Sequence, residues 1–347
     1  MLLHGIFPPL TTPFYPDGKV YFRKLEANVE RYSKTPVAGL VVLGSTGEAI
    51  LLSDDEQREV LRAAREAAAP EKVLVAGTGS ESAVETLRLT EYAATLGYDA
   101  AMVRTPHYYK AQMKPENMLA FYRTVADRSP LPVIIYNFPP NTGYDIPAEV
   151  VIALAEHPNL IGIKESGGDI NKVKAMVAGT RHVQRSVAVT EVFEAVTGRM
   201  RAAPAAVGAN IVPASALGAV AVAAPPAGLK TRTKEVGFQV MVGSAHLLHS
   251  MLEAGAVGAI LAFADCAPTA CFEIYTAWKE NDLDLAREKQ ERIARASLRV
   301  VGELGVPGLK HALDFNGYYG GPPRLPLLAP TAEVKAEIER LLECIRN

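Results

Sequence analysis

The sequence predicts an α/β protein whose 347 residues form a closed (β/α)₈ barrel (TIM barrel) with a helical extension at its C-terminal end. Three observations predict this architecture. Short apolar runs alternate with amphipathic segments, which is the pattern of repeated βα units around a parallel sheet. The runs are apolar throughout rather than alternating, as in strands covered on both faces. No phosphate loop or dinucleotide fingerprint follows the first run, which weakens the alternative of an open, doubly wound sheet.

Eight apolar or β-branched runs are the expected strands. In chain order they are residues 5–10 (GIFPPL), 39–43 (GLVVL), 73–77 (VLVAG), 100–104 (AAMVR), 132–136 (PVIIY), 160–164 (LIGIK), 238–242 (FQVMV) and 258–261 (GAIL). Eight such strands with helices between them favour closure into a barrel.

Helical segments with start signals lie between these strands. Ser53 and Glu56 have the spacing of a capping box, in which the serine oxygen accepts a backbone N–H and the glutamate reaches back. Residues 81–96, 115–128 and 147–156 carry apolar residues at three- and four-residue steps. Two of these segments begin with proline, which suits a first helical turn.

The C-terminal part of the chain has a different pattern from the barrel. From Ala264 onward the pattern is helical nearly to the end, broken by the Gly/Pro-rich residues 317–330. We therefore expect a barrel over residues 1–263 and a helical extension over residues 264–347.

An alanine- and valine-rich region at about residues 181–234 interrupts the barrel pattern between the sixth helix and the seventh strand. No charged residue occurs between Ala202 and Leu229, and this stretch is long enough to cross a membrane. Alanine adds little hydrophobicity, however, and prolines interrupt the stretch. We expect a partly irregular insertion rather than a membrane span, with a translated non-coding segment as an alternative.

Composition excludes several classes of partner. Hydrophobic residues make up 49% and charged residues 21% of the chain, which suits a sizeable core. The net charge of −2 gives no electrostatic reason to expect nucleic acid or an acidic membrane as partner. Cys266, Cys271 and Cys344 are too few for a disulfide framework or a zinc cluster. No secretion signal is recognisable at the amino terminus, so we expect a cytoplasmic protein with reduced thiols.

Chemistry-bearing residues follow the expected strands, where the active sites of such barrels lie. The second strand leads into Gly44–Glu48 (GSTGE), whose hydroxyls and backbone N–H groups can receive a carboxylate. The fourth strand leads into residues 105–109 (TPHYY), and the fifth ends at Tyr136 and Asn137. Each of these features also occurs in ordinary loops, so none of them alone assigns a function.

Lys164 ends the sixth strand, directly after three apolar residues. Burial there disfavours the charged form of its amine. One interpretation is a lysine that extends to solvent or pairs with a carboxylate such as Glu165. The other is an amine whose lowered pKa leaves it nucleophilic toward a ketone. Convergence with Tyr136, Ser45 and Thr46 at the barrel mouth favours the second interpretation.

Four motifs in this order resemble a known family. GSTGE (44–48), TPHYY (105–109), YNFPPNTG (136–143) and GIKESGGD (162–169) look like motifs of the dihydrodipicolinate synthase/N-acetylneuraminate lyase superfamily of class I pyruvate-dependent aldolases. The resemblance covers almost the whole chain except about residues 181–234. It implies a lyase that forms a Schiff base with a small 2-oxo acid and needs no metal or organic cofactor.

Carried over position by position, the resemblance implies a role for several residues. Lys164 would form the Schiff base and Tyr136 would be the acid/base phenol. Ser45 and Thr46 would hold the carboxylate of the 2-oxo acid and relay protons, and Tyr108 would complete the relay. The matching tyrosine of the family usually reaches into the neighbouring subunit's site, so the resemblance implies a homodimer or homotetramer.

Within the superfamily, the motifs are most similar to those of 4-hydroxy-2-oxoglutarate aldolases. Dihydrodipicolinate synthase carries an arginine shortly after the YN motif to bind the aldehyde's carboxylate, whereas residues 139–143 are PPNTG. By this likeness Ser166 would contact the distal end of the substrate. The implied substrate-binding residues are Ser45, Thr46, Asn141, Ser166, Gly243 and Ser244.

The expected reaction is cleavage of a 4-hydroxy-2-oxo acid to pyruvate and an aldehyde such as glyoxylate. A dehydratase or a condensing enzyme of the dihydrodipicolinate synthase type would use the same imine. A metal-dependent aldolase is a third alternative, because His246, His249 and Glu253 are spaced along one face of an expected helix. A disabled binding or sensor protein is a fourth, because the insertion follows the strand that carries Lys164.

Overall fold

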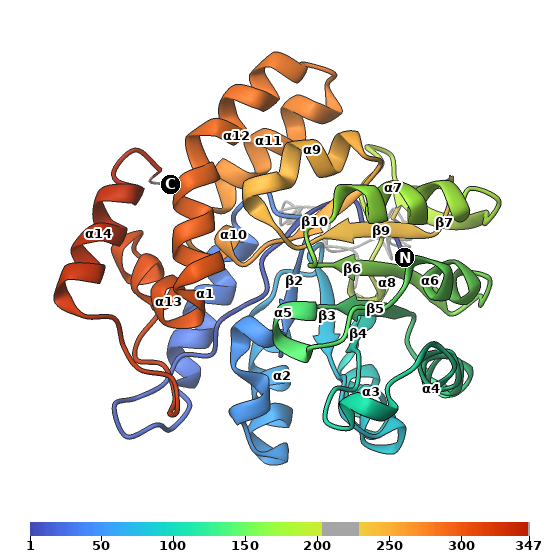
Figure 1. The fold of residues 1–347 in the computed structure, drawn as a ribbon, viewed down its shortest axis with the longest axis horizontal. Helices are drawn as coiled ribbons and strands as arrows, with labels where there is room; N and C mark the ends of the chain where they lie inside the picture. Colours follow the sequence, from blue (N-terminus) through green and yellow to red (C-terminus); the bar gives the residue numbers. More distant parts are fainter. Residues whose placement is uncertain (203–228, 346–347) are drawn as a thin grey trace, which may run out of the picture.

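The computed structural model describes residues 1–202 and 229–345 (Figure 1). All eight strands expected from the sequence are present in one parallel sheet. They are β1 (Gly5–Phe7), β2 (Gly39–Val42), β3 (Val73–Gly77), β4 (Ala100–Arg104), β5 (Val133–Asn137), β6 (Leu160–Glu165), β9 (Gln239–Val242) and β10 (Gly258–Ile260).

The sheet curves into a barrel. Its strand order is β1-β10-β9-β6-β5-β4-β3-β2, and every neighbouring pair is parallel. Backbone hydrogen bonds join the two ends of this order: Ala38 N–H donates to Ile6 O at 2.9 Å, and Val41 N–H donates to Pro8 O at 3.0 Å. The predicted barrel fold is therefore confirmed.

Side chains alternate between the two faces of each strand. One set fills the barrel interior, and its members include Phe7, Val41, Val75, Met102, Ile134, Tyr136, Met241 and Ile260. The other set packs outward in the larger core that the helices share. Because both faces are covered, the strands are apolar throughout.

The helices between the strands surround the barrel (Figure 1). They are α1 (Phe22–Ser33), α2 (Asp54–Ala67), α3 (Ala83–Leu96), α4 (Pro115–Arg128), α6 (Ala148–Ala155), α7 (Ile170–Gly179) and α9 (Leu248–Glu253), with the short α5 (Pro139–Thr142) after β5. Glu56 N–H donates to Ser53 Oγ at 3.3 Å, and Ser53 N–H donates to Glu56 Oε2 at 2.9 Å. The predicted capping box therefore begins α2.

The C-terminal part is helical as predicted and lies along one side of the barrel (Figure 1). It contains α10 (Phe263–Cys266), α11 (Pro268–Lys279), α12 (Leu283–Ser297), a π-helical segment (Leu298–Glu303), α13 (Gly305–Phe315) and α14 (Ala332–Leu342). None of the helices within the described ranges is long and apolar enough to cross a membrane.

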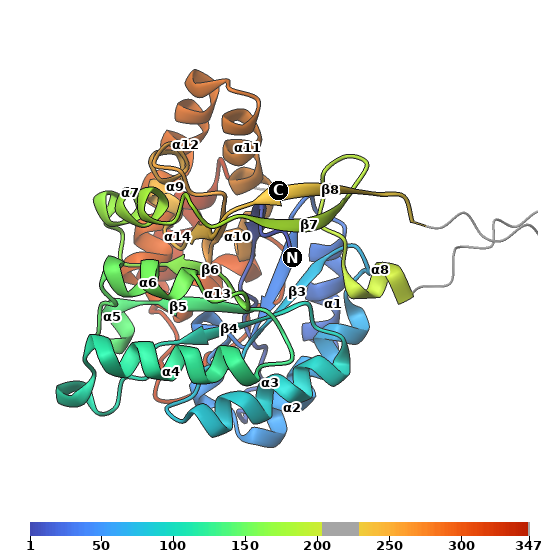
Figure 2. The same ribbon diagram turned by 90° about the vertical axis from the view of Figure 1, so that its right-hand side faces the viewer.

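The flanks of the expected insertion form a two-stranded antiparallel sheet rather than irregular chain. It pairs β7 (Arg185–Thr190) with β8 (Thr231–Val236) and projects to one side (Figure 2). The alanine-rich stretch between them, for which a membrane span was weighed, falls at residues 203–228, outside the described residues.

The segment that leads away from β7 docks at the amino ends of the strands. Thr197 Oγ1 donates to Pro70 O at 2.5 Å, and Gly198 N–H donates to Asp99 Oδ1 at 3.0 Å, next to the starts of β3 and β4. Strand β6 pairs directly with β9. The described flanks therefore leave the barrel wall intact and lie at the end opposite to the carboxyl ends of the strands.

Candidate active site

Lys164 lies inside the barrel near the carboxyl end of β6. Its neighbour Ile163 packs outward, so strand alternation turns Lys164 inward. It is paired in register with Tyr136 on β5, only 5% of it is exposed, and its Nζ lies 4.3 Å from the centre of the Tyr136 ring. Burial lowers the pKa of this amine to about 7, although the nearby Asp265 opposes the shift. A substantial fraction of Lys164 is therefore uncharged and nucleophilic at neutral pH.

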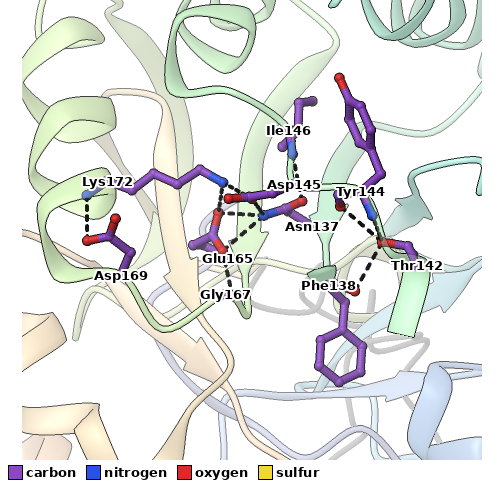
Figure 3. Close-up of polar contacts among 10 residues, drawn as sticks. All are labelled: Asn137, Phe138, Thr142, Tyr144, Asp145, Ile146, Glu165, Gly167, Asp169 and Lys172. Atoms are coloured by element: carbon purple, nitrogen blue, oxygen red, sulfur yellow. Dashed lines mark hydrogen bonds and ion pairs between the residues drawn. The ribbon is translucent and has the colours of Figure 1, made fainter. Parts of the chain in front are cut away.

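Glu165, the neighbour considered as a partner for Lys164, points toward Asn137 and Lys172 (Figure 3). Its carboxylate accepts hydrogen bonds from Asn137 Nδ2 at 2.9 and 3.0 Å and from Gly167 N–H at 2.6 Å. Lys172 Nζ forms an ion pair with it at 3.1 Å. The alternative of a Lys164–Glu165 pair is therefore excluded, because adjacent strand residues face opposite sides.

Asn137 also fixes the loop that follows β5 (Figure 3). This fully buried side chain donates to Asp145 Oδ1 at 2.7 Å and accepts from Ile146 N–H at 3.1 Å. Thr142 Oγ1 donates within the same loop, to Phe138 O or Tyr144 O, each 3.1 Å away. The loop beside Tyr136 is thus held by hydrogen bonds that the YNFPPNTG motif alone does not reveal.

The turn after β2 lies against the phenol. Ser45–Gly47 forms one turn of 3₁₀ helix, and Ser45 Oγ lies 3.3 Å from Tyr136 Oη. Leu43 and Glu48, on either side, have positive φ angles of 62° and 53°. Such conformations are costly for residues with side chains and concentrate at functional sites. The turn is therefore held in a strained conformation beside the reactive groups, where its backbone N–H groups can receive a carboxylate.

Burial affects the phenol as well as the amine. It raises the pKa of Tyr136 to about 12, although the hydrogen bond with Ser45 and the charge of Arg104 oppose the shift. At neutral pH, Tyr136 therefore carries its proton and can act first as an acid. Thr46, the other hydroxyl expected here, is buried with 8% of its surface exposed.

Gly243 and Ser166 lie on the other side of Lys164. A Cβ added at Gly243 would lie 2.0 Å from Ser166 Oγ and 3.4 Å from Lys164 Cε. Ser166 Oγ is buried and makes no hydrogen bond to any residue in the described ranges. Its orphaned hydroxyl is therefore available to a substrate atom. Ser244 comes next and precedes the short turn Ala245–Leu247.

We expect Gly243→Ala to destabilise the protein by about 1–3 kcal/mol, because the added methyl group forces Ser166 or Lys164 out of place. We also expect slower imine formation with pyruvate. Urea denaturation and the rate of pyruvate adduct formation measure the two effects. Gly198→Ala is the control for a methyl group added where there is room, because its Cβ would lie 3.9 Å from Asp99 Oδ1. An equal loss in both variants would contradict the steric argument.

Two predicted site residues are not brought to Lys164 within this chain. Tyr108 is 74% exposed and stacks edge-on against Tyr109 at 5.2 Å. Asn141 lies on the exposed side of α5. Neither residue lines the cavity beside Tyr136. The place of Tyr108 suits the predicted contact with a neighbouring subunit, which stays a prediction.

The proposed metal ligands do not gather. His249 Nδ1 lies 3.6 Å from Glu253 Oε2, and 5% of His249 is exposed. Across residues 1–202 and 229–345, no group of three or more His, Cys, Asp or Glu side chains is placed to hold a metal ion. His246, His249 and Glu253 therefore do not form the metal site considered from the sequence.

Sequence reasoning missed three charged residues around the site. Arg104 ends β4 in register with Tyr136. Asp265 is fully buried on α10, and burial holds the pKa of its carboxyl well above its ordinary value although Lys164 opposes the shift. Lys310 on α13 forms a buried ion pair with Glu48 at 2.5 Å. The alternation of inward and outward side chains along β4 would have indicated Arg104. Asp265 and Lys310 lie on segments distant in sequence, and no local pattern around them indicates a place near the site.

Comparison with known proteins agrees with this geometry. The sequence model of the dihydrodipicolinate synthetase family matches residues 2–190 and 227–345. A 4-hydroxy-tetrahydrodipicolinate synthase of Methanothrix thermoacetophila is 28% identical over 98% of this chain and 96% of its own. A probable mitochondrial 4-hydroxy-2-oxoglutarate aldolase of Emericella nidulans is 30% identical over 99% of this chain and 98% of its own.

Solved structures show the same fold. A dihydrodipicolinate synthase of Bacillus anthracis superposes with a TM-score of 0.79 at 22% identity, and all of both chains is covered. The prophage protein YagE of Escherichia coli K12, solved in complex with pyruvate, superposes with a TM-score of 0.77 at 25% identity over 99% of both chains. The family match leaves residues 191–226 unmatched, a narrower gap than the insertion expected from the sequence. With its motifs, barrel and full-length relatives in agreement, this chain belongs to the dihydrodipicolinate synthetase family.

Proposed function

We propose that this protein cleaves a 4-hydroxy-2-oxo acid, such as 4-hydroxy-2-oxoglutarate, to pyruvate and an aldehyde such as glyoxylate. The family is one of pyruvate-dependent aldolases and lyases, and this chain is such an enzyme. The single observation that carries the proposal is the environment of Lys164. This amine is buried, unpaired by the neighbouring Glu165, and has a pKa of about 7 beside the Tyr136 phenol.

The chemistry begins with attack of uncharged Lys164 on the C2 carbonyl of the substrate. Tyr136 gives its proton to the departing hydroxyl, so water leaves and a protonated imine forms. The Tyr136 phenolate then takes the proton of the C4 hydroxyl. The C3–C4 bond breaks, its electrons pass into the imine, and the aldehyde departs. The remaining enamine is protonated at C3 and hydrolysed to pyruvate.

The Ser45–Thr46 turn holds the substrate carboxylate in this scheme and so orients the imine beside Tyr136. The lysine supplies the electron sink, so we propose that no metal or organic cofactor takes part. We further propose a homodimer or homotetramer in which the exposed Tyr108 enters the partner's site and completes the proton relay.

One feature favours aldol cleavage over a synthase that binds the carboxylate of its aldehyde through the loop after β5. The loop Pro139–Thr142 carries no arginine. Next to this loop, Lys110 Nζ would lie 3.3 Å from a Cβ at Gly143, and Lys110 is exposed. The full-length relatives include one named as an aldolase and more named as synthases, so their names favour neither reaction.

Borohydride trapping with pyruvate, read by intact mass, tests the imine, and NMR analysis of the products from 4-hydroxy-2-oxoglutarate tests the cleavage. We expect one covalent adduct per chain and equal amounts of pyruvate and glyoxylate. Loss of water without glyoxylate would instead assign a dehydratase. A folded protein that forms no adduct would contradict the Schiff-base mechanism and favour a binding protein.

A further inference from the structure

Arg104 is an inward-facing cation at the carboxyl end of the barrel. On β4, Ala100 and Met102 belong to the interior cluster, whereas Ala101 and Val103 pack outward. Alternation therefore directs Arg104 inward, one layer beyond Met102. In the sheet it lies directly beside Tyr136, a partner in register on β5. A guanidinium thus stands next to the phenol that handles the substrate's protons.

A cavity joins these groups. Its volume is about 250 Å³, and its walls include Ser45, Tyr136 and Arg104. Arg104 is mostly shielded from solvent, with 19% of its side chain exposed. Gly79 makes room for it, because a Cβ at Gly79 would lie 2.4 Å from Arg104 N and 2.9 Å from Arg104 Cγ. The lack of a Cβ at Gly79 therefore leaves room for Arg104 in the wall of the cavity that Ser45 and Tyr136 also line.

Most N–H donors of the Arg104 guanidinium are free to bind a ligand. Within the described ranges, its guanidinium makes one hydrogen bond, from Nη1 to Glu81 Oε1 at 3.2 Å. Glu81 is also held by the backbone N–H groups of His107 and Tyr108, at 2.8 and 2.9 Å, and by the His107 ring at 2.7 Å. A guanidinium offers five N–H donors in a planar fork that matches a carboxylate. Glu81 therefore orients Arg104 without using up its hydrogen-bonding capacity.

Other cations near the cavity are less suited to this role. Arg58 and Arg88 also line it, but the Arg58 guanidinium lies over the Tyr92 ring at 5.5 Å. Arg88 is paired with Glu85 at 3.0 Å, and 59% of its side chain is exposed. Lys110 is exposed and lies outside the cavity lining. An anion held beside Tyr136 therefore meets Arg104 first, in a partly buried setting where a charge-assisted hydrogen bond is strong.

We propose that Arg104 binds the distal carboxylate of a dicarboxylic 4-hydroxy-2-oxo acid and so selects substrates whose aldehyde fragment is itself an acid. The inference rests on the proposed function and names the residue that sets its specificity. The Ser45–Thr46 turn takes the first carboxylate, Lys164 takes C2, and Arg104 takes the far end. Arg104 on β4 thereby binds the distal carboxylate, for which the loop after β5 has no arginine.

The test compares two substrates in wild type and Arg104→Gln. The substrates are 4-hydroxy-2-oxoglutarate and 4-hydroxy-2-oxopentanoate, which lacks the distal carboxylate and releases acetaldehyde. We expect kcat/KM for the dicarboxylic substrate to fall about 10- to 100-fold, the range for loss of a charge-assisted hydrogen bond. The kcat/KM for the monocarboxylic substrate should fall much less, only through loss of a charge that lowers the pKa of Tyr136. The final yield of trapped pyruvate should stay near the wild-type value.

Three further variants separate binding from support of the 107–108 loop. Glu81→Gln removes the Arg104 ion pair but keeps the guanidinium, so it should retain the preference for the dicarboxylic substrate. Arg88→Gln and Lys110→Gln each remove one positive charge nearby and should retain it too. Equal losses on both substrates in Arg104→Gln would overturn the inference, as would a loss of preference in Arg88→Gln or Lys110→Gln instead.

Pyruvate trapping distinguishes failure of this inference from failure of the proposed function. A wild type that traps pyruvate but shows no preference dependent on Arg104 overturns the specificity assignment alone. A folded wild type that traps no pyruvate overturns the Schiff-base function and the substrate assignment together.

Discussion

Replacing Lys164 with methionine is expected to abolish the pyruvate adduct and to raise the stability of the protein. Without the amine no imine forms, so we expect cleavage to fall by at least about 10⁴-fold, as when a nucleophile is removed from other enzymes. Methionine is unbranched and of similar length, so it fills the same space in the barrel. Steady-state pyruvate release and intact-mass analysis after borohydride treatment measure the loss.

The gain in stability depends on pH in a defined direction. Burial lowers the pKa of Lys164 from 10.5 to about 7. Between these values the unfolded chain keeps a proton that the folded chain releases, so wild-type stability rises with pH by about 1.4 kcal/mol per unit. Below pH 7 both states are charged and the full cost of burial is present. Methionine carries no such cost, so its advantage over wild type should be about 2–3 kcal/mol larger at pH 7 than at pH 9.

Urea denaturation of both proteins at pH 7 and pH 9 measures this difference. Lys174→Met is the matched control, because Lys174 lies exposed on α7 and its charge is solvated in the folded and unfolded states alike. An adduct that persists in Lys164→Met would place the imine on another lysine. A gain in stability that does not change with pH would show that Lys164 is not buried as an uncharged amine.

The sequence predicted the parts of this protein that follow local rules. The strands were recognisable because runs such as residues 73–77 and 132–136 are apolar throughout, and Lys164 stood out because a cation ends one such run. Glu165 was weighed as its partner because it is adjacent, yet the pleat separates the two residues. Neighbours in a strand are on opposite faces, whereas Lys164 and Tyr136 meet across two strands, which is the convergence that the sequence favoured.

Contacts between distant segments could not be predicted. Nothing around Lys172 indicates that it pairs with Glu165, since their meeting depends on how α7 packs against β6. The pairing of β7 with β8 could not be predicted, because the alanine-rich composition between the two strands does not indicate which of their residues pair. Nothing in the sequence around Lys310 indicates its link to the catalytic end of the barrel, and recognising that link required the fold.

That link concerns a second buried lysine. Lys310 is 1% exposed, and its Nζ forms an ion pair with Glu48 Oε1 at 2.5 Å. It also donates to Thr12 O at 2.8 Å and Pro322 O at 3.0 Å. Glu48 is 2% exposed and closes the strained turn that holds Ser45 and Thr46. The C-terminal extension therefore supports the carboxylate-binding turn through the ammonium group of Lys310 and the backbone N–H of Arg324.

Lys310→Met should destabilise the protein by about 3–5 kcal/mol, the range for breaking one side of a buried ion pair. Glu48 would keep the hydrogen bond from Arg324 N–H at 2.8 Å but lose its counter-charge. We also expect the KM for the 2-oxo acid to rise, because the turn loses its anchor. Urea denaturation and steady-state kinetics measure both effects. Adding Glu48→Gln should recover part of the stability, since it removes the unpaired charge.

The changes of Lys164 and Lys310 to methionine test whether pairing decides the cost of burying an amine, because they should change stability in opposite directions. Each is buried and each lies 4.3 Å from the centre of an aromatic ring, Lys164 over Tyr136 and Lys310 over Phe14. They differ in their partners, because Lys310 has a carboxylate and two carbonyl groups, whereas Lys164 has no ion pair or hydrogen bond within the described ranges. The same change to methionine should therefore stabilise the protein at Lys164 and destabilise it at Lys310. If both changes destabilised the protein equally, side-chain packing rather than pairing would decide the cost of burying these amines.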